Sequence, residues 1–260
     1  MLDWITPLLL GLIEGVTEFL PVSSTGHLLI AERWLPRQSD LFNTVIQCGA
    51  VLAVVMIFTD RVRELLFNWR NPETRDYLLK LTTAFVITGI GGLTLKKLHF
   101  KLPEELAPVA WATFIGGVLF LGVEWWLKGR RLLPRISWTT AIAVGCAQLV
   151  AAVFPGTSRS GITILTALAL GLSRPAATEF SFLLGIPTLL AAGGLQIVGA
   201  LKEPPEQPIN WLMLGAATLV AAVTAFVAVK WLLKFVQTHT FVGFAWYRIA
   251  LGLLLLIFLN

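Results

Sequence analysis

The segment Glu14–His27 places two carboxylates, two serines and a histidine in a stretch that is otherwise apolar enough for a membrane. An ionised side chain at the centre of a bilayer costs roughly 2.5–3.5 kcal/mol on insertion scales. Glu14 and Glu18 are four residues apart, so a helix places both on one face. A need for solubility does not explain why two side chains with this insertion cost lie within one helical turn. The pair therefore predicts a polar reaction or binding site inside a membrane protein.

A second polar break, Pro155–Gly161, interrupts another apolar run. In hydrocarbon every backbone polar group needs a partner, so a broken helix survives only where it lines a cavity or is buried in protein. We therefore expect residues 4–33 and 137–174 to form two re-entrant helix–loop–helix hairpins. The polar groups at the two hairpin tips would converge on one site.

The chemistry of these tips favours a phosphate substrate. Residues that begin helices present backbone N–H groups and the positive end of the helix dipole, which suit anions, and Arg159 adds a bidentate donor. Glu14 and Glu18 would repel an anion unless a divalent cation, Mg²⁺ or Ca²⁺, lies between them. His27 follows Ser24 closely enough to act as its general base, or as an acid toward the leaving phosphate. The pattern predicts metal-assisted phosphoryl transfer.

The remaining polar residues at the tips are predicted to bind the substrate through hydroxyl and backbone N–H groups. They are Ser23, Thr25, Gly156, Thr157, Ser158 and Ser160. Ser23 and Thr25 could equally be helix caps or hydrogen-bonding groups between helices. Gln148 and Glu179 are expected to pack against the hairpins, whereas the sequence leaves open whether Tyr247 and Arg248 anchor the last helix or line the cavity.

Composition defines the class of protein. The 260 residues are 56% hydrophobic and only 13% charged, with a mean hydropathy of +0.78. These values predict a single-domain, all-α polytopic membrane protein over residues 1–260. The net charge is +5, but the basic residues lie in short loops, which favours a topology signal over a nucleic-acid surface. The first apolar run lacks a basic n-region, so we expect it to remain in the mature protein.

Six apolar runs are long enough to cross a bilayer, at about 42–59, 78–95, 107–127, 178–200, 210–230 and 241–259. Three crossings separate the two hairpins, so the second hairpin must enter from the opposite face. Aligning Pro21 with Pro155 places Glu14 on Gln148 and Ser24 on Ser158. We therefore predict inverted repeats over 1–127 and 137–260, with a site near the midplane.

Basic residues give the expected orientation. They are more numerous near 61–80, 128–135 and 230–234 than in the loops at the other ends of the crossings, which places these loops in the cytoplasm. Residues 61–80 are expected to form a solvated loop. Both termini and the opening of the site would then face outward.

The segments Glu14–Leu28 and Phe154–Thr163 resemble the two signature motifs of the undecaprenyl-pyrophosphate phosphatases, the bacitracin-resistance family, and the resemblance covers essentially the whole chain. It implies hydrolysis of undecaprenyl diphosphate to undecaprenyl phosphate, which recycles the lipid carrier for peptidoglycan and other cell-wall polymers. It also implies a divalent metal and a site on the periplasmic face of the bacterial inner membrane. The functional positions of the family fall on Glu14, Glu18, Ser23, Ser24, Thr25, His27 and Arg159.

The main alternative is a polyprenyl-phosphate transporter or flippase, because inverted repeats with broken helices are also typical of transporters. A serine close to a histidine favours chemistry over transport. Direct attack by serine and attack by an activated water both remain open. So does the oligomeric state, with a homodimer among the alternatives.

Overall fold

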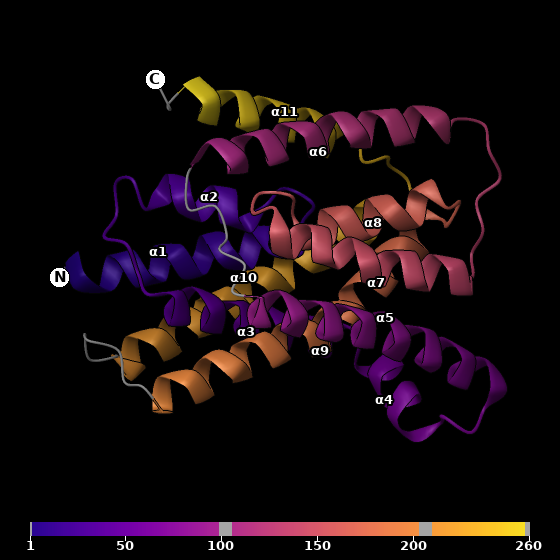
Figure 1. Cartoon of the computed structure of the whole chain (residues 1–260), viewed down its shortest axis with the longest axis horizontal. Helices are drawn as coiled ribbons and strands as arrows, with labels where there is room; N and C mark the ends of the chain where they lie inside the picture. Colours follow the sequence, from indigo (N-terminus) through magenta and orange to yellow (C-terminus); the bar gives the residue numbers. More distant parts are fainter. Residues whose placement is uncertain (1, 99–105, 203–209, 258–260) are drawn as a thin grey trace.

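The computed structural model describes residues 2–98, 106–202 and 210–257, and this part of the chain is helical, without strands. One isolated bridge pairs Leu133 with Leu172. The all-α prediction is confirmed. The helices shown in Figure 1 are α1 (Leu2–Thr17), α2 (Ser24–Ala31), α3 (Asp40–Ile57), α4 (Thr59–Phe67), α5 (Pro72–Lys97), α6 (Leu106–Trp126), α7 (Trp138–Val153), α8 (Arg159–Ala169), α9 (Arg174–Lys202), α10 (Trp211–Phe235) and α11 (Val242–Ile257).

Five of these helices, α3, α5, α6, α9 and α10, are long and apolar enough to cross a membrane. They coincide with the first five predicted crossings, and they confirm a polytopic membrane protein. The sixth predicted crossing corresponds to α11, which is apolar but only 16 residues long. Its predicted end, 258–259, lies outside the described residues.

The predicted solvated loop at residues 61–80 is wrong. Most of this segment is helical, because α4 continues to Phe67 and Asn71 caps α5, whose first residue is Pro72. The Glu64 carboxylate accepts hydrogen bonds from Arg61 at 2.6 Å and from Thr74 at 2.9 Å, which joins α4 to α5. These two hydrogen bonds hold the pKa of Glu64 below its ordinary value.

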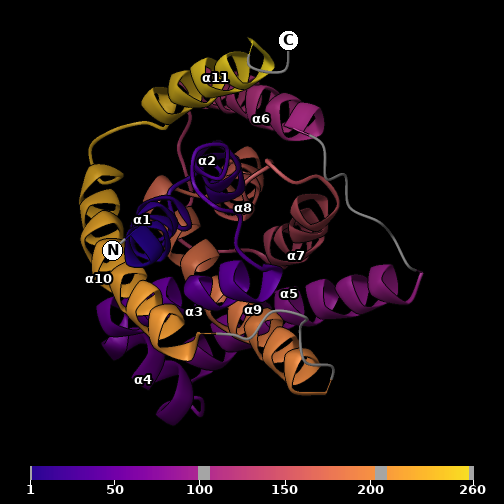
Figure 2. The ribbon, with the colours of Figure 1, turned by 90° about the vertical axis from the view of Figure 1, so that its left-hand side faces the viewer.

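Two short helix pairs enter the molecule from opposite ends (Figure 1). The pair α1–α2 enters from the end where both termini lie, and the pair α7–α8 enters from the end where α6 connects to α7. Figure 2 shows α2 and α8 in the centre, surrounded by the longer helices. These are the two predicted re-entrant hairpins.

The helices of the two halves pack reciprocally. The first hairpin packs through α1 on α10 of the second half, and the second hairpin packs through α7 on α5 of the first half. Among the other long helices, α6 packs on α11, and α3 packs on both α10 and α9. Internal repeats would produce this pattern. The division into repeats over 1–127 and 137–260 stays a prediction.

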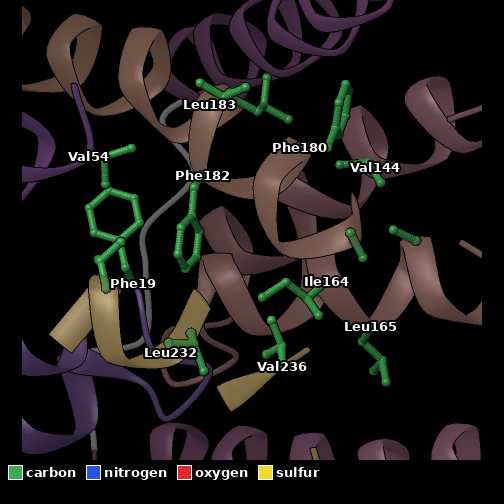
Figure 3. Close-up of a cluster of buried hydrophobic side chains, with 14 of the residues drawn as sticks. Phe19, Val54, Val144, Ile164, Leu165, Phe180, Phe182, Leu183, Leu232 and Val236 are labelled. Atoms are coloured by element: carbon green, nitrogen blue, oxygen red, sulfur yellow. The ribbon is translucent and has the colours of Figure 1, made fainter. Parts of the chain in front are cut away.

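The largest hydrophobic cluster extends directly to the first hairpin tip (Figure 3). Phe19 lies in the break after α1 and is fully buried. Its ring meets the ring of Phe182 on α9 in an edge-on contact, with 5.0 Å between centroids. The apolar core therefore fixes the backbone next to Glu18.

Helices α1 and α10 pack closely because residue 15 of α1 is a glycine, which has no Cβ atom. A Cβ atom at Gly15 would collide with the carbonyl oxygen of Ala221 and the hydroxyl of Thr224. A Cβ atom at Gly215, also on α10, would meet nothing within 4 Å.

We therefore expect Gly15→Ala to lower the free energy of unfolding by about 1–3 kcal/mol, the usual cost of overpacking. Gly215→Ala is the control, and its helix propensity should leave stability unchanged or raise it by up to about 1 kcal/mol. Thermal unfolding in detergent would compare the two. Equal Tm values would contradict the tight α1–α10 contact.

Candidate active site

The two hairpin tips use the same unusual cap. Ser23 precedes α2 with φ of 72°, and its hydroxyl accepts a hydrogen bond from the N–H of Gly26 at 3.3 Å. Ser158 precedes α8 with φ of 68°, and its hydroxyl accepts from the N–H of Gly161 at 3.1 Å. Such angles are strained for a residue with a Cβ atom, and such strain is concentrated at functional sites.

These caps correct the alignment of the repeats by one residue. The sequence paired Ser158 with Ser24, whereas the geometry pairs it with Ser23. The second loop is longer by one residue between its proline and its cap, and it contains Gly156 at φ of 92°. As a result, the first residues of the two short helices, Ser24 and Arg159, occupy equivalent positions.

Both of these residues bind the same carboxylate. The Ser24 hydroxyl donates to Oε2 of Glu18 at 2.8 Å, and the Arg159 guanidinium donates to Oε1 at 2.9 Å. The Glu18 side chain is 7% exposed and that of Arg159 is 13% exposed. The structure thus joins a hydroxyl, an acceptor for its proton and a permanent cation from two hairpins in one buried cluster.

Arg159 is held from several sides. Its guanidinium lies over the Phe19 ring, 5.0 Å from the centroid, and donates to the Ser181 carbonyl at 3.4 Å. Gly185 leaves room for it, because a Cβ atom there would collide with the guanidinium. Its Nε atom has no hydrogen-bond partner among the described residues, so a donor remains for a phosphoryl oxygen.

Most of the residues predicted to bind substrate are engaged in structural contacts. The Ser160 hydroxyl lies 3.2 Å from the Glu18 carbonyl and 3.0 Å from the Leu20 carbonyl, which connects the two tips. Thr157 donates to its own loop, at the carbonyl of residue 154, and Thr25 is exposed. With Ser23 and Ser158 acting as caps, binding of substrate by this group stays a prediction.

His27 contacts a different partner from the one predicted. Its Nδ1 lies 2.7 Å from the Ser23 carbonyl, and its Nε2 lies 2.6 Å from the hydroxyl of Tyr247 on α11. Ser24 is instead turned to Glu18. In this conformation Glu18 is the proton acceptor next to the serine, and the role of His27 as base stays a prediction without a contact to support it.

Glu14 lies one turn before Glu18 and is fully buried. Neither of its carboxylate oxygens has a hydrogen-bond partner within the described part of the chain. Its counterpart Gln148 donates to the Thr88 hydroxyl at 2.7 Å. Glu179, expected beside the hairpins, forms an ion pair with Arg61 of α4 at 3.3 Å.

Arg248 is a site residue that sequence reasoning did not assign. It is fully buried, and Gly116 leaves the space that its guanidinium fills. The hydrogen-bond acceptors of this guanidinium are the backbone carbonyls of Pro21, Ala112, Thr113, Gly156 and Thr157, at 2.9–3.3 Å. It thereby provides donors for both broken segments at once, as apolar surroundings require. A lone arginine in an apolar helix was the signal in the sequence.

Two cavities border the hairpins, and Glu18, Ser24 and Arg159 are not among the residues that line them. One, of about 350 Å³, is lined by α1, α10 and α11 and has His27 and Tyr247 at its polar edge. The other, of about 410 Å³, lies between α6, α7 and α8 and touches Thr157 and Arg248. Both have mainly apolar walls.

These features define a class of protein, a helical membrane protein in which two re-entrant hairpins bring a half-buried serine, a buried carboxylate and an arginine together. Comparison with known proteins is more specific. The family model described as Bacitracin resistance protein BacA matches residues 7–254, and the chain belongs to this family.

Curated relatives support the assignment. The chain is 52% identical over 256 residues to a protein of Rhizobium etli named undecaprenyl-diphosphatase, covering 98% of this chain and 97% of the relative. It is 50% identical to proteins of the same name from Xylella fastidiosa, over 100% of both chains, and Xanthomonas oryzae, over 100% of this chain and 98% of the relative.

We expect Arg248→Gln to destabilise the protein by about 3 kcal/mol or more, because several buried carbonyls lose their donors at about 1–3 kcal/mol each. Arg135→Gln is the matched control, since among the described residues Arg135 pairs with Glu73 in an exposed ion pair, worth about 0–1 kcal/mol. Chemical unfolding in detergent measures both variants. If Arg248→Gln were no less stable than the control, Arg248 would not hold the hairpins together.

Proposed function

We propose that this chain hydrolyses undecaprenyl diphosphate to undecaprenyl phosphate and inorganic phosphate, which recycles the carrier for cell-wall synthesis and counters bacitracin. One observation carries the proposal. Ser24 and Arg159 contact opposite oxygens of the Glu18 carboxylate, so a hydroxyl with an adjacent proton acceptor lies beside a cation suited to phosphate. The names of the relatives support the same activity.

In this proposal Glu18 receives the proton at Oε2, either from Ser24 as the hydroxyl attacks the terminal phosphorus or from a water that Ser24 orients. The bond between that phosphorus and the bridging oxygen breaks, and the carrier monophosphate leaves with the proton that Glu18 received. When water attacks, inorganic phosphate forms directly; when Ser24 attacks, a water then cleaves the phosphoserine, which releases inorganic phosphate and restores the serine hydroxyl. Arg159 stabilises the charge that develops on the phosphoryl oxygens. Preorganised donors of this kind usually make the largest contribution to catalysis.

The substrate would approach from the membrane through the cavity of about 350 Å³ beside His27. Its walls are apolar, with Val16, Leu20, Trp231 and Phe235 among them. Such walls suit part of an isoprenoid chain, while the polar edge suits the diphosphate.

The donor set fits a divalent cation, Mg²⁺ or Ca²⁺, held by Glu14 and Glu18. The two unpartnered oxygens of Glu14 are the supporting observation, because a buried carboxylate needs a counter-charge. No group of three or more His, Cys, Asp or Glu side chains occurs in the described ranges that could hold a metal alone. Oxygens of the substrate would complete the coordination, as is usual for Mg²⁺. When bound, such a cation would neutralise charge on the phosphoryl oxygens.

We place this site on the outer, periplasmic side of the bacterial inner membrane. The basic segments 61–80 and 128–135 lie at the end of the molecule opposite both termini (Figure 1). Cytoplasmic loops are the ones enriched in Lys and Arg. The hairpin α1–α2 enters from the other, outer end.

Ser24→Ala tests the proposal and separates it from transport. We expect phosphate release from a polyprenyl diphosphate by the purified protein in detergent to fall at least about 100-fold, while binding of the carrier changes little. The control is Ser39→Ala, which removes the cap of α3 and should keep near wild-type turnover. A folded wild type that releases no phosphate with any metal would favour the transporter alternative.

The metal has a separate test in Glu14→Gln. We expect Mg²⁺ or Ca²⁺ to raise the Tm of the wild type but not that of Glu14→Gln. Without metal the variant should be the more stable protein, because it no longer buries an unpaired carboxylate. Glu32→Gln, which keeps the oxygen that accepts from Asn43, should respond to metal like the wild type. An equal metal response in Glu14→Gln would remove Glu14 from the site.

A further inference from the structure

The contact between His27 and the Ser23 carbonyl determines which ring nitrogen of the histidine carries the hydrogen. A carbonyl oxygen only accepts, so the 2.7 Å contact with the Ser23 carbonyl requires a hydrogen on Nδ1. In the neutral ring Nε2 is then the acceptor, and the Tyr247 hydroxyl donates to it at 2.6 Å. The two rings are nearly parallel, at 4°, with centroids 5.7 Å apart.

In this arrangement the basic nitrogen of His27 is occupied by the Tyr247 hydroxyl. The serine hydroxyl is committed to Glu18 at 2.8 Å. The neighbouring cation, Arg248, is directed to backbone carbonyls. His27 is therefore organised for a partner other than the serine.

His27 and Tyr247 border the cavity that we propose for the substrate. His27 and Tyr247 both line the space of about 350 Å³, and Tyr247 is 46% exposed. Thr17 also lines it, but its hydroxyl donates to the Ile13 carbonyl at 2.7 Å. An imidazole and a phenol, together with the indole of Trp231, are thus the side chains with polar groups that a lipid with an anionic head would meet there.

We propose that Tyr247 is a positioning residue: its hydroxyl holds the imidazole of His27 beside the cavity, and when the lipid diphosphate enters, a P–OH group of the lipid replaces that hydroxyl at the Nε2 lone pair and transfers its proton to His27. The O–H bond of that group breaks and an N–H bond forms at Nε2, leaving an imidazolium hydrogen-bonded to the phosphoryl oxygen. The Tyr247 hydroxyl then donates to the same phosphate. This inference rests on the proposed function.

The variant Tyr247→Phe removes the phenol hydroxyl but keeps the ring stacked on His27, so it tests the contribution of the hydroxyl alone. We expect kcat/KM for a polyprenyl diphosphate to fall about 3–10-fold, as for loss of one neutral hydrogen bond. The control is the adjacent Trp246→Phe, which removes an N–H donor from an exposed side chain and should leave kcat/KM unchanged.

A readout independent of turnover is ¹⁵N NMR of His27. The chain has three histidines, so His99→Gln with His239→Gln leaves a single signal pair. We expect Nδ1 to be protonated and Nε2 to be an acceptor, with the Nε2 resonance moving toward that of a free acceptor in Tyr247→Phe. A non-hydrolysable polyprenyl methylenediphosphonate should convert Nε2 to the protonated form.

Three results would overturn the inference: protonation at Nε2 in the free protein, an Nε2 resonance that Tyr247→Phe does not move, or a bound diphosphonate that leaves Nε2 unprotonated. Failure of the proposed function is distinguishable, since the wild type would then release no phosphate whatever the state of His27. Active wild type with unchanged Tyr247→Phe would refute the role of Tyr247 alone.

Discussion

The Glu18 carboxylate, held between Ser24 and Arg159, is the constraint on which the arrangement of the hairpins depends. A charge in apolar surroundings must be paired, and removal of one partner of a buried pair typically costs 3–5 kcal/mol because the other charge remains. The partners of Glu18 come from both hairpins, so the charge is satisfied only when the two tips meet. The need to pair the Glu18 charge therefore holds the two hairpin tips together, and it also places a hydroxyl, a base and a cation at one point.

A second requirement explains why so many polar residues of the tips are occupied. Each break leaves backbone groups without helical partners, and hydrocarbon supplies none. Arg248 provides donors to carbonyls of both breaks, and Ser160 connects the second tip to the backbone around Glu18. The hydroxyl groups at the tips therefore mainly form hydrogen bonds with the backbone. Fewer polar side chains than the sequence suggests are left to act on a substrate.

Sequence predicted the elements that follow from polarity and periodicity, namely the crossings, the two hairpins and the meeting of Glu18 with Arg159. It failed where the outcome depends on contacts between distant segments. No residue near His27 in the sequence indicates that its Nε2 atom is hydrogen-bonded to Tyr247, which lies 220 positions further along the chain. The sequence did not predict helix α4, because its charged residues are typical of a solvated loop. The hydrogen bond from Thr74 to Glu64, which joins α4 to α5, cannot be read from the sequence pattern. A one-residue difference in loop length shifted the alignment of the caps.

The two halves share geometry but differ in chemistry, which explains why one site results instead of two. Equivalent first residues of the short helices are Ser24 and Arg159, a hydroxyl and a cation. The long arms of the hairpins differ likewise, with unpartnered Glu14 in one and Gln148, bonded through its amide, in the other. Identical halves would place two carboxylates or two cations face to face, and like charges at close range repel. Divergence of the repeats avoids that repulsion and pairs Glu18 with Arg159 across the two tips, so that the proposed reactive groups come from one hairpin and the proposed phosphate-binding cation from the other.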